Sequence, residues 1–161
     1  MRSLNSKGFT LIELTIVIAL FSLVSTLLLF NVSKPKAFAD ITSSEDLIIS
    51  TLKEVQSKSM LGGLEGLVQP TTFGVHFEQD KYVLFRGTIY NPADSYNLEA
   101  PLKPNLSFSQ INLPNQNVIF SRLSGEVQGF VSTQNSFTLL EKNTSETRIF
   151  TIDRFGAINV N

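Results

Sequence analysis

The hydrophobic pattern begins with a long apolar run. From Phe9 to Phe30 the chain has 22 residues and a single charged side chain, Glu13. As a helix this run would be roughly 33 Å long, which is enough to cross a bilayer. We therefore predict a membrane-spanning segment over 9–30. A lone carboxylate near its edge is costly to hold in hydrocarbon and implies a cationic partner close by.

The pattern changes after Phe30. Lys34-Pro35-Lys36 interrupts it, and because proline removes a helical hydrogen bond, we predict a kinked linker over 31–40. An amphipathic helix is predicted over 42–61. Ser43 and Ser44 are expected at its N-cap, Glu45 and Asp46 in its first turn, and Gly62-Gly63 at its stop.

One face of the predicted helix is apolar. Its stripe consists of Ile48, Leu52, Val55 and Ser59. A helix with a single apolar stripe packs that face and leaves the other in water. We therefore expect the helix over 42–61 to lie against a sheet.

The period changes to two from Phe73 onward. Strands are predicted over 73–77, 82–86, 107–113, 118–123, 137–142, 148–153 and 157–160. Residues 91–105 contain three prolines and are predicted to form a long loop. The expected fold is α+β: a long N-terminal helix, half membrane-spanning and half amphipathic, packed on an antiparallel β-sandwich or curved sheet that occupies 73–161.

The charges are unevenly distributed. Arg2 and Lys7 precede the apolar run, and residues 41–161 hold nine Lys and Arg against twelve Asp and Glu, a balance of −3. Positive charge on the short flank predicts a cytoplasmic N-terminus and an exported domain over 41–161. The acidic balance argues against nucleic acid as a partner, because phosphate binding needs clustered cations.

The chain offers little for catalysis. It has no cysteine, and its one histidine, His76, falls on the polar face of a predicted strand, where a solvated side chain is the simpler interpretation. Glycine motifs for phosphate or a nucleophilic serine are missing. We therefore expect the chain to contain no catalytic residue, to bind no metal or cofactor, and not to be an enzyme.

Three other interpretations of the N-terminus account for less of its sequence. A cleaved secretory signal has a shorter apolar core and a small-residue cleavage site, and a soluble core helix has a polar stripe. A plain signal anchor explains the length but not Glu13.

The stretch Lys7-Gly8-Phe9-Thr10-Leu11-Ile12-Glu13-Leu14 resembles the class III signal of type IV pilins and type II secretion pseudopilins. The resemblance implies removal of residues 1–8 by a prepilin peptidase, which cuts between Gly8 and Phe9, and N-methylation of Phe9. It also implies that Glu13 neutralises the N-terminal ammonium of a neighbouring subunit during assembly. Because burying either charge alone is costly, such a pair would fix the register between subunits.

The later pattern resembles one group within that family, the H-type minor pseudopilins and FimT-like minor pilins. The resemblance rests on Phe73-Gly74-Val75-His76-Phe77 and on the segments 118–125 and 148–160. Gly125 and Gly156 are expected to supply turn positions with φ > 0.

The resemblance implies a minor pilin or pseudopilin, a structural subunit of a type IV pilus or a type II secretion pseudopilus. The implied partners are prepilin peptidase, other pilin or pseudopilin subunits, the inner-membrane assembly platform and membrane lipid. The implied location is a single pass through the inner or cytoplasmic membrane, with the C-terminal domain periplasmic or extracellular, and then the pilus or pseudopilus. The sequence does not separate the two systems.

Two alternatives belong to other classes. A DNA-uptake or adhesive pilin would bind DNA or a surface, but Arg148 and Arg154 are offset by Glu146 and Asp153. A membrane-anchored enzyme would keep its activity after substitution of Glu13.

Overall fold

The computed structural model describes residues 9–30, 33–62 and 71–161, without the side chains of 27–35. The expected leader 1–8, Gly63 and the first two residues of the expected linker lie outside this description. The chain divides into two compact units, Met1–Lys36 and Ala37–Asn161, which are described separately.

The first unit contains helix α1 (Leu11–Phe30). Three hydroxyl side chains along it donate to backbone carbonyls of the preceding turn: Thr15 to Ile12 O, Ser22 to Ile18 O and Thr26 to Ser22 O, at 2.8–2.9 Å. Such bonds satisfy polar groups within the helix itself. Over the described residues, no helix combines the length and apolar character that a membrane crossing requires.

Helix α2 extends over Ser33–Leu61 and so begins well before the expected start at residue 42. The segment containing Pro35 was expected to break the helix but forms its first turn. In that turn the missing proline N–H has no helical acceptor to lose, so proline is tolerated. At the other end, Gly62 follows Leu61 with φ 73°, the left-handed geometry that stops a helix.

The early start of α2 corrects two predicted roles. Ser43 and Ser44 do not cap the helix, since both lie in its interior; Ser43 Oγ donates to Asp40 O at 3.1 Å and Ser44 is buried. Glu45 and Asp46 are likewise not first-turn charges. Glu45 instead accepts from Arg148 Nε at 3.2 Å and so joins α2 to a strand far along the chain.

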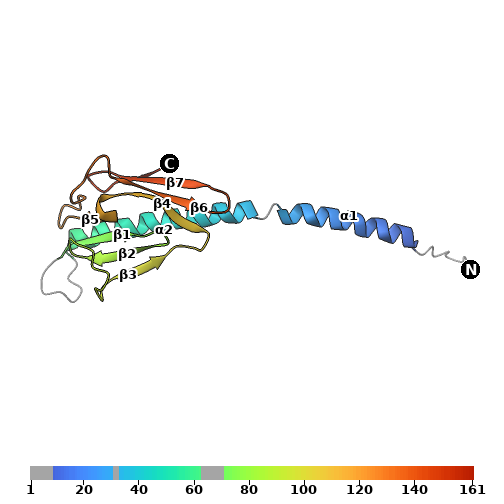
Figure 1. The fold of residues 1–161 in the computed structure, drawn as a ribbon, viewed down its shortest axis with the longest axis horizontal. Coiled ribbons are helices and arrows are strands. Elements are labelled where there is room, and N and C mark those ends of the chain that lie inside the picture. The colour runs from blue at the N-terminus through green and yellow to red at the C-terminus, as the bar shows by residue number, and fades with distance from the viewer. Residues whose placement is uncertain (1–8, 31–32, 63–70) are drawn as a thin grey trace, which may run out of the picture. The chain divides into compact units, whose positions relative to one another are not determined.

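Among the described residues that follow, the chain forms eight strands and a 3₁₀ turn. They are β1 (Phe73–Phe77), β2 (Lys81–Arg86), β3 (Leu98–Pro101), β4 (Leu106–Asn112), η1 (Pro114–Gln116), β5 (Asn117–Phe120), β6 (Ser136–Glu141), β7 (Thr147–Ile152) and β8 (Ile158–Val160). The α+β class is confirmed, with two antiparallel sheets of order β3-β2-β1-β5 and β4-β6-β7-β8 (Figure 1).

Strand β3 was not predicted, because it lies within the region 91–105 that was expected to be a loop. Its residues 98–101 pair with β2 in register Leu84↔Leu98 to Lys81↔Pro101. Pro101 ends the strand at the edge of its sheet, where proline leaves no ladder bond unmade. The proline content that suggested a loop is therefore compatible with a short edge strand.

The core of the second unit is aromatic. Phe137 on β6 is 1% exposed and stacks on Phe150 of β7 with ring centroids 4.6 Å apart and planes 8° apart. Phe77 of β1 lies 4.4 Å from Phe137, and Phe108 of β4 meets it edge-on at 5.5 Å. Rings from both sheets therefore meet at one residue, Phe137.

The predicted stripe of α2 faces this core. Ile48, Leu52 and Val55 are each 1% exposed and belong to the same buried cluster. Ser59 is fully buried and its Oγ accepts from Phe73 N at 2.9 Å, so the polar end of the stripe is satisfied by β1.

Gln56 ties α2 to two turns of the β region. Its Nε2 donates to Gly125 O and to Phe155 O, both at 2.9 Å. Gly125 and Gly156 have φ 69° and 80°, so both were placed correctly as left-handed turn positions. A Cβ on Gly156 would lie 2.4 Å from Gln56 Nε2, so that glycine also makes room for the amide.

A second, smaller cluster covers the outer face of the sheet β3-β2-β1-β5. Phe85 of β2 pairs with Gly74 of β1, and its ring occupies the space that a Gly74 side chain would need. Tyr90, from the segment between β2 and β3, packs edge-on against Phe85 at 5.5 Å and stacks on His76 at 4.0 Å. This segment is therefore anchored on the sheet by aromatic contacts.

Candidate functional site

The first turn of α1 holds a reciprocal capping arrangement. Glu13 Oε2 accepts from both the backbone N–H and the hydroxyl of Thr10, each at 2.9 Å. The backbone N–H of Glu13 donates back to Thr10 Oγ1 at 3.3 Å. This is the capping box expected of a T-x-x-E sequence, and it fixes where α1 begins.

The capping role of Glu13 was missed from the sequence, although T-x-x-E is its signature. The expectation for this carboxylate concerned a neighbouring subunit, and the structure shows bonds to Thr10 of its own chain. Both bonds fall on Oε2, and a carboxylate has about four acceptor sites. Glu13 can therefore cap its own helix and accept from a further donor.

From Phe9 to Leu20 the side chains around Glu13 are apolar apart from Thr10 and Thr15. Large side chains around the axis are each more than half exposed in the single chain: Leu11, Ile12, Leu14, Ile16, Val17 and Ile18. A helix with an apolar surface all round is stable only inside lipid or among other helices. Phe9, the residue expected to begin the mature chain, is 87% exposed, and Gly8 lies outside the described residues.

The arginines considered for DNA binding are positioned differently from each other. Arg148 is engaged on both sides, by Glu45 at 3.2 Å and Glu146 at 2.8 Å. Arg154 is two-thirds exposed and lies 4.0 Å from Glu126, whereas the expected partner Asp153 accepts from turn backbone N–H groups. The structure therefore does not bring these two cations together as a phosphate-binding patch.

The described part of the chain does not assemble a metal centre. Among these residues no group of three or more His, Cys, Asp or Glu side chains lies close enough to hold an ion. His76 lies on the outer face of its strand, as expected, and is partly exposed; its Nδ1 lies 2.7 Å from Asn117 Oδ1 and its ring is stacked on Tyr90.

The most unusual carboxylate of the second unit is Glu141, at the end of β6. It is fully buried and accepts from Asn105 Nδ2, from the backbone N–H and Nδ2 of Asn143, and from the N–H and hydroxyl of Thr144, at 2.7–3.0 Å. Burial by itself raises the pKa of Glu141. The hydrogen bonds from Thr144, Asn105 and Asn143 outweigh it and lower the pKa to about 2. These contacts hold the turn between β6 and β7, so Glu141 is a structural group.

This carboxylate predicts a pH dependence of stability. A folded pKa of about 2, below the ordinary 4.5, means that the ionised group stabilises the fold above pH 4.5 and that this contribution is lost as the pH falls toward 2. We expect Glu141→Gln to lower the Tm of a fragment of residues 33–161 by several degrees at pH 7. The difference from wild type should shrink between pH 4.5 and 2, as followed by circular dichroism.

A matched control is Glu54→Gln. Glu54 is exposed and, within the described chain, pairs with Lys58 across one helical turn at 2.9 Å. This variant should behave like wild type at every pH. A Tm difference for Glu141→Gln that stays constant from pH 7 to 2 would contradict the assigned role.

Comparison with known proteins gives a match for the N-terminal region. Residues 3–29 match the family model described as a prokaryotic N-terminal methylation motif. No curated protein and no solved structure matches the chain significantly. The family match ends before α2, so it covers the first unit only. The second unit is interpreted from its geometry.

The matched motif indicates a precursor of the type IV pilin or pseudopilin kind. It implies processing by a prepilin peptidase, a membrane-anchored precursor and assembly with other pilin subunits. It also points to a structural subunit and not to an enzyme. The α+β architecture with two antiparallel sheets is consistent with a pilin fold.

Proposed function

We propose that this chain is a minor pilin or pseudopilin that is cut between Gly8 and Phe9, methylated at Phe9, and built into a filament as a structural subunit. The observation that carries the proposal is the methylation motif over residues 3–29, with Glu13 placed in the first turn of α1. The assignment to the H-type and FimT-like group is part of the proposal and rests on the order of motifs over 73–160.

Glu13 is proposed to act in assembly by receiving the Phe9 ammonium of an adjoining subunit. Cleavage creates that ammonium, and the apolar side chains around α1 would surround both charges once helices pack together. An ammonium and a carboxylate in such surroundings are stable only as a pair. The pair therefore selects one axial offset between subunits.

The precursor is proposed to cross the inner or cytoplasmic membrane once, through residues 9–30. This span is inferred from the length and composition of the sequence. Arg2 and Lys7 would hold the N-terminus in the cytoplasm, and the domain over 41–161 would lie outside, with the assembly platform and lipid as further partners.

The proposal is tested by the mass of the mature N-terminus. Chain recovered from a bacterial host with its own prepilin peptidase should begin at Phe9 and carry one added methyl group. A host lacking the peptidase should yield the chain beginning at Met1. Wild-type filaments containing a chain that begins at Met1 would overturn the proposal.

A further inference from the structure

A cavity of about 470 Å³ opens on the outer face of the sheet β3-β2-β1-β5, away from the phenylalanine core. His76 of β1 and Asn117 of β5 are paired neighbours on its floor, with Ile119 beside them. These positions alternate with the buried side chains of Val118 and Phe120, which places them on the opposite face of the sheet.

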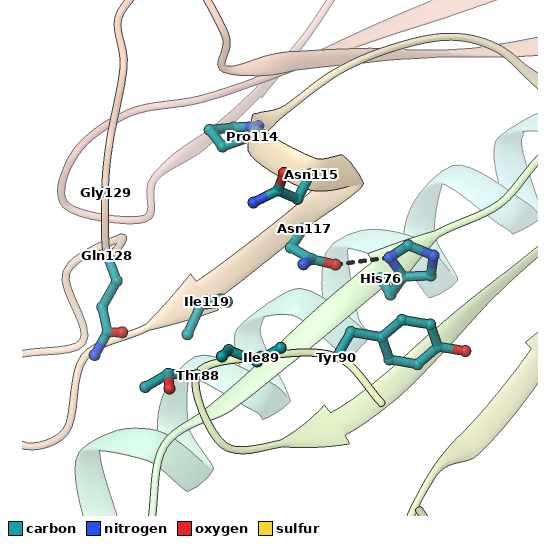
Figure 2. A pocket seen from close by; sticks show the side chains of 10 residues that line it. All are labelled: His76, Thr88, Ile89, Tyr90, Pro114, Asn115, Asn117, Ile119, Gln128 and Gly129. Carbon is teal, nitrogen blue, oxygen red and sulfur yellow. Dashed lines mark hydrogen bonds between the residues drawn. The ribbon is translucent and has the colours of Figure 1, made fainter. Parts of the chain in front are cut away.

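Three separate segments surround that floor, as Figure 2 shows. Residues 88–90, between β2 and β3, lie along one side, Pro114 and Asn115 of η1 along another, and Gln128 and Gly129, which follow β5, along the third. The cavity is therefore built by loops around a rigid sheet, which is the common construction of binding sites in β proteins.

The polar groups of the cavity are neutral. Among the described residues that line it there is no Asp, Glu, Lys or Arg, whereas Asn115, Asn117 and Gln128 each supply a side-chain amide. An amide presents both donors and acceptors. Because a carbonyl oxygen only accepts, His76 Nδ1 donates to Asn117 Oδ1 across their 2.7 Å contact.

Apolar surface lies between these groups. Ile89 is 80% exposed, an unusual position for a large aliphatic side chain in a loop, and it lines the cavity with Ile119 and Pro114. Tyr90 contributes an aromatic ring that is already fixed by its stack on His76. The cavity thus alternates amide groups with small apolar faces.

The backbone of η1 is held in a costly conformation beside the cavity. Asn115 and the adjacent Gln116 both have positive φ, 51° and 60°. Two successive non-glycine residues in this region are strained, and such strain persists mainly where a functional geometry requires it. Here it is maintained by the bonds Gln116 N to Leu113 O at 3.0 Å and Asn117 N to Pro114 O.

We propose that this cavity binds a neutral saccharide, one hexose or N-acetylhexosamine unit of a glycan. Sugar hydroxyls both donate and accept, as side-chain amides do, and the C–H faces of the ring match the apolar surface of Ile89 and Ile119. Phosphate or nucleic acid would require cationic groups, which the described lining residues do not supply, and a fatty chain would leave the side-chain amides of Asn115 and Gln128 unsatisfied. The inference does not depend on the proposed pilin function.

The test uses the full chain in a zwitterionic detergent without a sugar headgroup. The probes are N-acetylglucosamine, methyl α-mannoside and maltose, with a 20-base-pair DNA duplex as a competing class. We expect saturation-transfer NMR to detect at least one saccharide with a Kd on the order of millimolar. Its titration should shift the side-chain amide signals of Asn115 and Gln128.

Two variants separate binding from folding. Asn115→Gly removes an amide and relieves the positive φ, so it should keep or raise Tm while weakening the saccharide about fivefold or more. Gln128→Ala should weaken binding similarly, since it also removes a side-chain amide. The fold should be unaffected, because the backbone bond from Gln128 N to Ile119 O is retained. The matched control is Gln110→Ala, an exposed amide on the other sheet, which should bind as wild type does.

Three results would overturn the inference. They are no saturable signal from any of the saccharides, equal saccharide affinity in wild type and both cavity variants, or binding of the DNA duplex alone. Each can occur with normal N-terminal processing, so failure here is distinct from failure of the proposed function.

Discussion

Glu13→Gln is expected to leave folding and N-terminal cleavage intact and to reduce incorporation into filaments on the order of 100-fold. Glutamine accepts the Thr10 N–H as glutamate does, so the capping box and the start of α1 are preserved. Only the charge is lost, and a Phe9 ammonium would then be buried without a partner. The fraction of the chain that co-purifies with other pilin subunits, compared with the fraction left in the membrane, measures the effect.

The complementary variant is Thr10→Val. It removes the hydroxyl that contacts Glu13 Oε2 at 2.9 Å but keeps the carboxylate. This change weakens a helix cap, an effect confined to the first turn, and should leave incorporation within about threefold of wild type. If Glu13→Gln assembled normally while Thr10→Val did not, Glu13 would be a capping residue only and the proposed assembly role would be wrong.

Phe137→Ala is expected to lower the free energy of unfolding of residues 33–161 by about 3–5 kcal/mol. This fragment is suitable because every core residue, from Ala37 to Ile152, lies within it. Phe137 contacts rings from both sheets, so its removal leaves a cavity between them. The rings of Phe77, Phe108 and Phe150 are held by their own strands and cannot move in to fill it. Urea unfolding followed by circular dichroism measures the change.

The control for this variant is Phe155→Ala. Phe155 has the same side chain but is two-thirds exposed, and its contact with Gln56 is made by the backbone carbonyl, which alanine retains. Its effect should stay within about 0.5 kcal/mol. Equal losses in the two variants would contradict the placement of the core at Phe137.

The sequence predicted the parts of the fold that depend on local periodicity. The stripe of Ile48, Leu52 and Val55 and the left-handed glycines at 125 and 156 are found where expected, because spacing and turn chemistry are local signals. The start of α2 was wrong for a related reason. A proline breaks a helix in its interior but not in its first turn, and the local sequence around Pro35 does not show which of the two positions it occupies.

The features that the sequence did not predict depend on contacts between distant residues. Residues 98–101 form β3 because they pair with the edge of β2. The sequence of these four residues alone does not predict that pairing. The alternation of polar and apolar residues along β1 places His76 on the outer face of the strand. It does not show which side chains lie next to His76 there. Tyr90 and Asn117, which enclose it, come from separate segments, and only the folded chain brings them together.

The outer face of the sheet β3-β2-β1-β5 has a consequence for how this protein can vary. The side chains that line the cavity and those that build the core alternate along β1 and β5, so they project from opposite sides of the same strands. Residues 88–89 and 114–115 can therefore change without disturbing the packed phenylalanines, whereas Tyr90 is tied to Phe85 by its ring contact. Related chains can diversify what this surface recognises while inheriting one unaltered scaffold.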